Sequence, residues 1–324
     1  MVAAVGADVA AAAAADGGAK EDGTMRSHFV CSLAVALAFA VLAGAADTTQ
    51  KTFATPADAL RALTDATRRN DQAALLAVLG PGSEDIISSG DPVEDRAAAE
   101  RFSTAARART RLETLPSGAV IAHVGKDDWP LPIPIVKDGD KWRFDAAAGR
   151  EELLNRRIGR NELSAINVCR VYVDAQHQHA ARERVYAQKI GSDPGKHDGL
   201  YWEDPTGKNP SPLGPLIADA TAEGYAKPGA SAEPQPYHGY FYRILTEQGP
   251  NAPGGARKYI QDGEMSRGFA LIAYPANYGT SGVMTFIVGP QGIVYQKNLG
   301  DKTADLAKAV TAWDPDESWT PVTD

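Results

Sequence analysis

The sequence has only two cysteines, Cys31 and Cys169, among its 324 residues. Cys31 lies in a segment that we expect to be removed, so Cys169 would have no partner for an intramolecular disulfide. A single cysteine in an exported protein can be reactive. Cys169, however, lies among apolar residues at helical spacing, which favours a buried and inert thiol. The mature chain is therefore expected to fold without a disulfide.

The sequence also lacks an excess of positive charge. It has 33 Lys and Arg against 41 Asp and Glu, a formal charge of −8. A general nucleic-acid partner is therefore not expected, because phosphate binding requires surplus cations.

The familiar motifs of catalysis and cofactor binding are absent as well. No His-Glu-x-x-His, phosphate loop, dinucleotide fingerprint or Gly-x-Ser-x-Gly occurs. His177 and His179 cannot clamp one metal ion from a single helix face, and we expect both on a solvated surface. We therefore predict no catalytic residue, no metal and no cofactor.

The N-terminal region has the pattern of an export signal. Residues 1–24 are rich in Ala and Gly without apolar periodicity, and we interpret them as disordered or as a misassigned start. Residues 25–45 begin with Met25-Arg26, continue with an apolar run and end in small residues, which is typical of a signal peptide. The apolar run is short for a membrane span, which needs roughly 20 residues, so cleavage is favoured over a retained anchor. We expect a periplasmic or secreted bacterial protein with no stable membrane span after cleavage.

Residues 50–148 predict an α+β domain in which helices precede strands. Thr55-Pro56 and Asp91-Pro92 have the residues of helix starts, an N-cap followed by Pro. A short helix is expected at 73–79. Short apolar runs between turn residues predict strands at 111–115, 118–124, 131–136 and 141–144.

This order, ending in Gly-Asp-Lys-Trp-Arg-Phe-Asp at 139–145, resembles the cone-shaped α+β fold of the nuclear-transport-factor-two-like superfamily. The resemblance implies a cavity between the helices and a curved sheet. The candidate ligand-binding residues are Asp91, Asp127, Asp128, Trp129 and Trp142. For Asp91, capping of a helix N-terminus is the favoured role. Asp127 and Asp128 are adjacent and fit a turn better than paired acid–base chemistry.

Residues 149–313 predict a second α+β domain, followed by a tail at 314–324. A charged helix begins near 149, and Gly159 either breaks it or lets it run into a main helix at 161–176. We expect one face of the main helix to pack on a sheet, with Leu163, Ile166, Cys169, Val173 and Ala180 on it. The long segment 190–236 has no periodicity and is expected to be functional or disordered, apart from a short helix at 213–222. Strands and a helix at 301–313 complete the domain.

The second half resembles the globular heads of type IV pilins and secretion pseudopilins. The resemblance is carried by Ala175-Gln176, Tyr240-Phe-Tyr242, Ala273-Tyr-Pro275 and Phe286 ahead of Gly292-Ile-Val-Tyr295. It implies an assembly or binding module.

Residues 50–320 also resemble a bacterial exported family, domain-of-unknown-function family twenty-nine-fifty. The segments that carry this resemblance are Ser-Ser-Gly-Asp-Pro-Val at 88–93, Arg-Arg-Ile-Gly-Arg-Asn-Glu-Leu at 156–163 and Tyr-Gly-Thr-Ser-Gly-Val-Met-Thr-Phe at 278–286.

Two functional hypotheses follow. The first is a non-enzymatic cell-envelope protein that binds or scaffolds an envelope protein, a small molecule or a glycan. The alternative is a periplasmic hydrolase or isomerase that uses a cavity in the first domain. An enzyme would need titratable groups that converge in that cavity.

Overall fold

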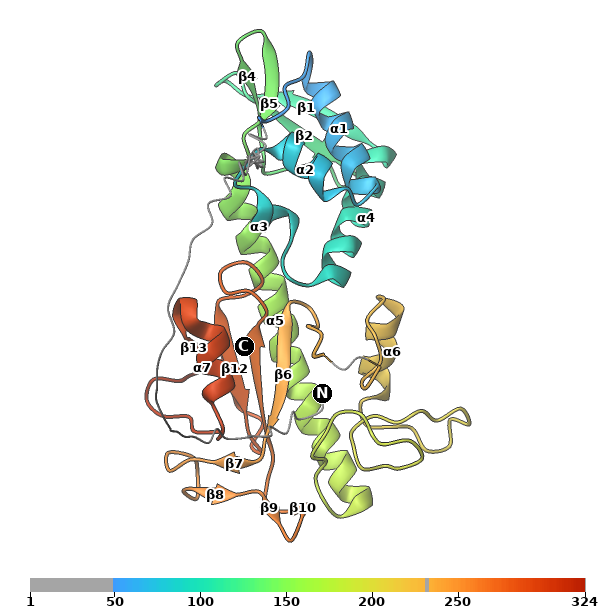
Figure 1. Ribbon diagram of the computed structural model, residues 1–324, viewed down its shortest axis with the longest axis vertical. Coiled ribbons are helices and arrows are strands. Elements are labelled where there is room, and N and C mark those ends of the chain that lie inside the picture. Colours follow the sequence, from blue (N-terminus) through green and yellow to red (C-terminus); the bar gives the residue numbers. More distant parts are fainter. Residues whose placement is uncertain (1–48, 231–232, 324) are drawn as a thin grey trace, which may run out of the picture. The chain divides into compact units, whose positions relative to one another are not determined.

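The computed structural model describes residues 49–230 and 233–323 (Figure 1). The expected signal peptide at 25–45 and the residues before it lie outside the described part. The fold is mixed α+β, as the sequence predicts. Two five-stranded antiparallel sheets each have their own apolar cluster. We call residues 49–148 the N-lobe and residues 160–323 the C-lobe.

The N-lobe contains four helices, of which α1, α2 and α4 contact its sheet. The helices are α1 (Pro56–Arg68), α2 (Gln72–Leu79), α3 (Glu84–Ile87) and α4 (Pro92–Ala108). The strands are β1 (Thr110–Thr114), β2 (Val120–Val124), β3 (Trp129–Pro130), β4 (Ile135–Asp138) and β5 (Lys141–Phe144). Their order is β1-β2-β4-β5, and β3 pairs with β2.

Local chemistry explains where the two longer N-lobe helices begin. The Thr55 hydroxyl accepts a hydrogen bond from the backbone N–H of Asp58, and Pro56 is the first residue of α1. Asp91 caps α4 in the same way ahead of Pro92. Both predicted helix starts are confirmed, because an N-cap satisfies backbone donors that the first turn leaves unpaired.

Helix α5 (Ala146–Glu183) runs without interruption from the N-lobe into the C-lobe (Figure 1). Gly159 does not break it, so the alternative in which the charged helix continues into the main helix is correct. The domain boundary predicted between residues 148 and 149 falls inside the first turn of this helix. One helix therefore belongs to both lobes.

The buried face of α5 differs from the expected one. Leu163 is 70% exposed, so its predicted place in the core is wrong. The buried line instead includes three polar side chains, Asn161, Gln176 and His179. Each of them hydrogen-bonds to backbone groups, which offsets the cost of burial. Apolar periodicity cannot reveal such positions.

His179 was expected in solvent and is buried. Its Nδ1 lies 2.8 Å from the carbonyl oxygen of Val185, and its Nε2 lies 2.9 Å from that of His197. The ring thereby ties α5 to the loop that follows it. His177 is exposed, as expected, and packs edge-on against Phe269.

The C-lobe sheet lies between two helices. Its order is β14 (Thr320–Pro321), β13 (Val294–Asn298), β12 (Met284–Val288), β11 (Ala270–Pro275) and β6 (Tyr240–Leu245), all antiparallel. Helix α5 contacts β11, β12 and β13, and helix α7 (Thr303–Ala309) contacts β11. Strand β11 is therefore buried almost throughout.

The remaining elements of the C-lobe are short. Helix α6 (Gly214–Ala222) lies in the long segment and matches the helix expected there. Two ribbons pair β7 (Glu247–Gln248) with β8 (Arg257–Lys258) and β9 (Ile260–Gln261) with β10 (Glu264–Met265). The 3₁₀ turn η1 (Gly300–Lys302) precedes α7.

The C-terminal region differs from its prediction in two respects. The helix predicted at 301–313 is shorter, since α7 ends at Ala309; on it Ala307 is buried and Leu306 is 46% exposed. The residues after 313 were expected as a tail, but β14 pairs with β13 and extends the sheet. The backbone of Trp313 also hydrogen-bonds to Glu247, which holds this region against the lobe.

Within residues 49–230 and 233–323, no helix combines the length and apolarity needed to cross a bilayer.

Candidate ligand-binding cavity

A cavity of about 760 Å³ lies in the N-lobe between the helices, the sheet and α5. Its walls are largely apolar. The apolar lining includes Leu63, Leu75, Leu79, Ile86, Ile87, Phe102, Val124, Leu131, Ile133 and Leu153. This volume lies within the roughly 300–1,000 Å³ typical of small-molecule sites.

Three alanines of α4 contribute to the open space of the cavity. Ala98, Ala99 and Ala105 lie along its wall, and Phe102 is the large apolar side chain that α4 adds. Methyl groups at these positions cannot reach across to the opposite wall. The N-lobe therefore encloses space where a densely packed core would have filled it.

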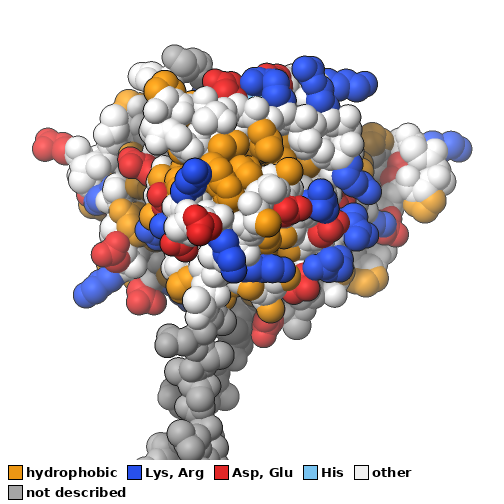
Figure 2. All heavy atoms as spheres, turned by 90° about the horizontal axis from the view of Figure 1, so that it is seen from above, with side chains coloured by type: hydrophobic (Ala, Val, Ile, Leu, Met, Phe, Trp, Pro, Cys, Tyr) orange, Lys and Arg blue, Asp and Glu red, His pale blue; other side chains and the backbone are white. Residues whose placement is uncertain are grey.

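Charged side chains gather around the cavity. The arginines among its lining residues are Arg101, Arg156, Arg157 and Arg160, and the acids are Glu94, Asp95 and Asp127. Figure 2, which views the molecule from the N-lobe end, shows apolar side chains grouped on that face and bordered by Lys and Arg with some Asp and Glu. The cavity thus combines an apolar interior with charged residues of both signs.

Three of the arginines come from one side of α5. The Arg156 guanidinium lies 5.4 Å from the centre of the Trp129 ring and donates to Glu152. Arg157 donates to the carbonyl oxygens of Asp85 and Ile86, both at 2.6 Å. Burial lowers the pKa of Arg157, and the nearby carboxylate of Asp95 partly opposes that shift.

Asp91 joins the N-lobe to the C-lobe at the edge of this region. Its buried carboxylate accepts from the backbone of Val93 and Glu94 through Oδ1. Through Oδ2 it accepts from the Tyr225 hydroxyl and the Gly239 backbone N–H, both at 2.9 Å. Burial and this carboxylate raise the pKa of Tyr225, because ionisation would place two negative charges together. Asp91 is therefore a cap, as favoured from sequence, and also a connection between the lobes.

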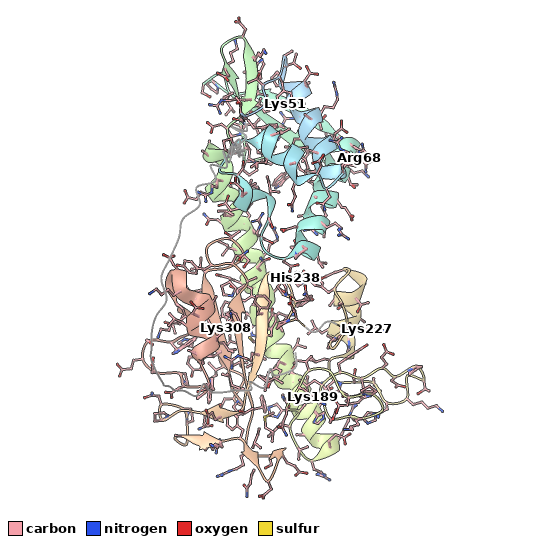
Figure 3. The ribbon with its side chains drawn as sticks, in the orientation of Figure 1. Lys51, Arg68, Lys189, Lys227, His238 and Lys308 are labelled. Atoms are coloured by element: carbon pink, nitrogen blue, oxygen red, sulfur yellow. The ribbon has the colours of Figure 1, made fainter. Side chains whose placement is uncertain are left out.

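His238 lines the cavity from the C-lobe, two residues before β6 begins (Figure 3). Its Nε2 lies 3.0 Å from a carboxylate oxygen of Glu223, and its Nδ1 lies 4.0 Å from one of Glu94. Its backbone has φ +48°, a conformation that non-glycine residues seldom adopt. The imidazole is thus held between two carboxylates at the edge of the cavity.

The five predicted ligand-binding residues do not converge on one site. Asp127 and Trp129 line the cavity, whereas Asp91, Asp128 and Trp142 are absent from its lining. Asp128 pairs with Arg111, which lowers the pKa of the Asp128 carboxyl group. Trp142 exchanges backbone hydrogen bonds with Phe53 at the sheet edge, and the Lys137 ammonium lies 5.7 Å from its ring centre. The adjacent aspartates therefore do different things: Asp127 lines the cavity and Asp128 pairs with Arg111. This agrees with the prediction that they form a turn and not a catalytic pair.

The arginines of α5 and His238 are not among the ligand-binding residues predicted from the sequence. A signal was present in Arg156-Arg157-Ile-Gly-Arg160, where the spacing brings arginines to neighbouring positions on a helix. No comparable signal marked His238, because its place depends on how the C-lobe meets α4. Within the described ranges, no group of three or more His, Cys, Asp or Glu is arranged to hold a metal ion.

Residues 50–322 match the family model described as "Protein of unknown function (DUF2950)". The chain belongs to this family. No curated protein and no solved structure matches it.

Proposed function

We propose that this DUF2950 protein is a non-enzymatic binding protein that holds a small, mainly apolar molecule in the N-lobe cavity. The observation that carries the proposal is the apolar lining of a cavity of about 760 Å³. Transfer of apolar surface from water into such a space is favourable, at roughly 25 cal/mol per Å². A small molecule fits this lining better than a glycan, which would need many polar partners.

The junction at Asp91 supports a binding role that involves both lobes. Asp91 begins α4, the helix that lines the cavity, and its carboxylate also holds Tyr225 and Gly239 of the C-lobe. Occupancy of the cavity can therefore influence how the lobes meet, and through them an envelope partner. The cone-like and pilin-like descriptions of the lobes belong to this proposal, since both kinds of fold serve as binding modules.

We also propose that the protein acts outside the cytoplasm, in the periplasm or after secretion. The support is the signal-peptide pattern of residues 25–45 in the sequence. N-terminal sequencing of the protein from a bacterial host should give a mature end near Ala46. A cytoplasmic protein that retains residues 25–45 would contradict export.

Binding can be tested with Nile red, a neutral dye that fluoresces in apolar sites. Saturable fluorescence is expected for the wild-type protein. Ala98→Trp should reduce the affinity at least about tenfold, because the indole would occupy the cavity. Glu100→Trp is the matched control, since residue 100 is exposed on α4 and does not line the cavity. Equal binding by both variants would contradict the proposed site.

His238 provides a specific reason to consider the alternative function, a hydrolase or isomerase. An imidazole between Glu94 and Glu223 could act as a general acid or base on a molecule in the cavity. This role can be tested by measuring hydrolysis of chromogenic esters and isomerisation of ketones by the protein. Turnover that disappears in His238→Gln, with Nile red binding intact, would replace the binding proposal by an enzymatic one.

A further inference from the structure

We infer that the ligand is a long-chain carboxylate, with its alkyl chain in the cavity and its head group at Arg157 and Arg160. This inference rests on the proposed binding function and adds the ligand class. The two arginines lie one turn apart on α5, and both line the same cavity as the apolar side chains. An amphipathic anion matches that combination.

Arg157 has positive charge without an ion-pair partner. Its printed hydrogen bonds go to the two neutral carbonyl oxygens of α3, Asp85 and Ile86. Among the described residues, no carboxylate oxygen lies within 4.0 Å of its side-chain nitrogens. A guanidinium has five N–H donors, so donors remain for a further acceptor. A half-buried cation of this kind is stabilised by an anion that enters beside it.

Arg160 adds a second positive charge on the same side of α5. Its side chain is exposed and forms no ion pair or side-chain hydrogen bond with the described residues. Arg156 and Arg101, by contrast, are already paired with Glu152 and Glu94. Arg157 and Arg160 are therefore the two cavity arginines without a direct ion pair to a described residue.

The acids near this position limit the charge of the head group. Asp95 accepts hydrogen bonds from the backbone N–H of Ser89 and the hydroxyl of Ser88, and Glu94 pairs with Arg101. Their field opposes a dianion more than a monoanion. A carboxylate also matches the planar fork of a guanidinium. These features favour a carboxylate over a phosphate monoester.

The test is displacement of Nile red by three molecules with the same chain, hexadecanoate, hexadecanol and hexadecyl phosphate. Hexadecanoate should bind about tenfold or more tightly than hexadecanol, since hydrogen bonds to a charged group typically add that much. Arg160→Gln should weaken hexadecanoate about tenfold and leave hexadecanol unchanged. Arg160→Lys should retain most of the affinity.

Arg96→Gln is the control, because it removes the same charge from an exposed residue of α4 that does not line the cavity. Hexadecanol binding as tightly as hexadecanoate, with no effect of Arg160→Gln, would overturn the head-group inference and leave the binding function standing. Tighter binding of hexadecyl phosphate would overturn the choice of a carboxylate. Failure of Nile red and all three molecules to bind would overturn the proposed function itself.

Discussion

Helices α4 and α5 each pack beside a sheet, but the larger cavity lies beside α4, in the N-lobe. In the C-lobe, α5 contributes Tyr172 to a core that also buries Phe269, Phe286 and Trp313. In the N-lobe, α4 brings Ala98 and Ala99 to the corresponding interior, and a cavity remains. Small side chains on α4 thus leave space next to the N-lobe core, where large side chains fill the C-lobe core.

The largest expected effect is a charge placed in the filled core. Cys169 is fully buried, and Cys169→Asp should lower the free energy of unfolding by about 3–5 kcal/mol, because an unpaired carboxylate would lose its hydration. Urea denaturation measures the change. Cys169→Ala is the control, and a similar loss in both variants would mean that packing, not charge, dominates.

Removal of an aromatic ring should destabilise the C-lobe core more than the lining of the N-lobe cavity. Phe286→Ala should cost about 3–5 kcal/mol, since it leaves a void in a dense core. Phe102→Ala should cost much less, because Phe102 is half-buried and already borders empty space. Thermal or urea unfolding of both variants checks the difference, and equal losses would indicate that the cavity is collapsed in solution.

The junction between the lobes should be sensitive to the charge of Asp91. Asp91→Asn should destabilise the protein by about 1–3 kcal/mol, because an amide presents N–H groups to donors that need an acceptor. Asp127→Asn, at an exposed position, is the matched control and should change little. Urea unfolding followed by tryptophan fluorescence would detect the loss. An unchanged midpoint for Asp91→Asn would show that the junction is hydrated and weak.

Added volume should have opposite consequences in the two lobes. Ala98→Leu extends into the cavity and should leave stability unchanged or raise it slightly. Ala273→Leu, at a fully buried position of β11, should cost about 1–3 kcal/mol through overpacking. Melting temperatures measured without ligand test this contrast. Destabilisation by Ala98→Leu equal to that by Ala273→Leu would argue against an open cavity.

The effect that is smallest at neutral pH concerns the buried thiol. Burial raises the pKa of Cys169 to about 12, above its unfolded value of roughly 8.5. Its contribution to stability is therefore complete below about pH 8.5 and is lost as pH rises toward 12. Stability of Cys169→Ala should decline less over that range. Labelling of native Cys169 by a thiol reagent should be much slower than in urea, and equal rates would contradict its burial.

The sequence by itself determined those helices and strands that are specified by residues close together in the chain. Thr55-Pro56 and Asp91-Pro92 start helices because capping groups act within one turn. The mixed α+β class, most N-lobe strands and the burial of Cys169 could also be predicted, since apolar spacing reports which face meets a core.

The tertiary structure decided the features that join distant segments. Polar Asn161 and His179 occupy the buried face of α5 because backbone groups from later loops satisfy them. His238 reaches the cavity because β6 begins where the lobes meet, and Asp91 becomes a junction because Tyr225 and Gly239 lie against it. The cavity itself depends on the space left between α4, α5 and the sheet. Sequence periodicity records the composition of a face but not the volume left between two faces.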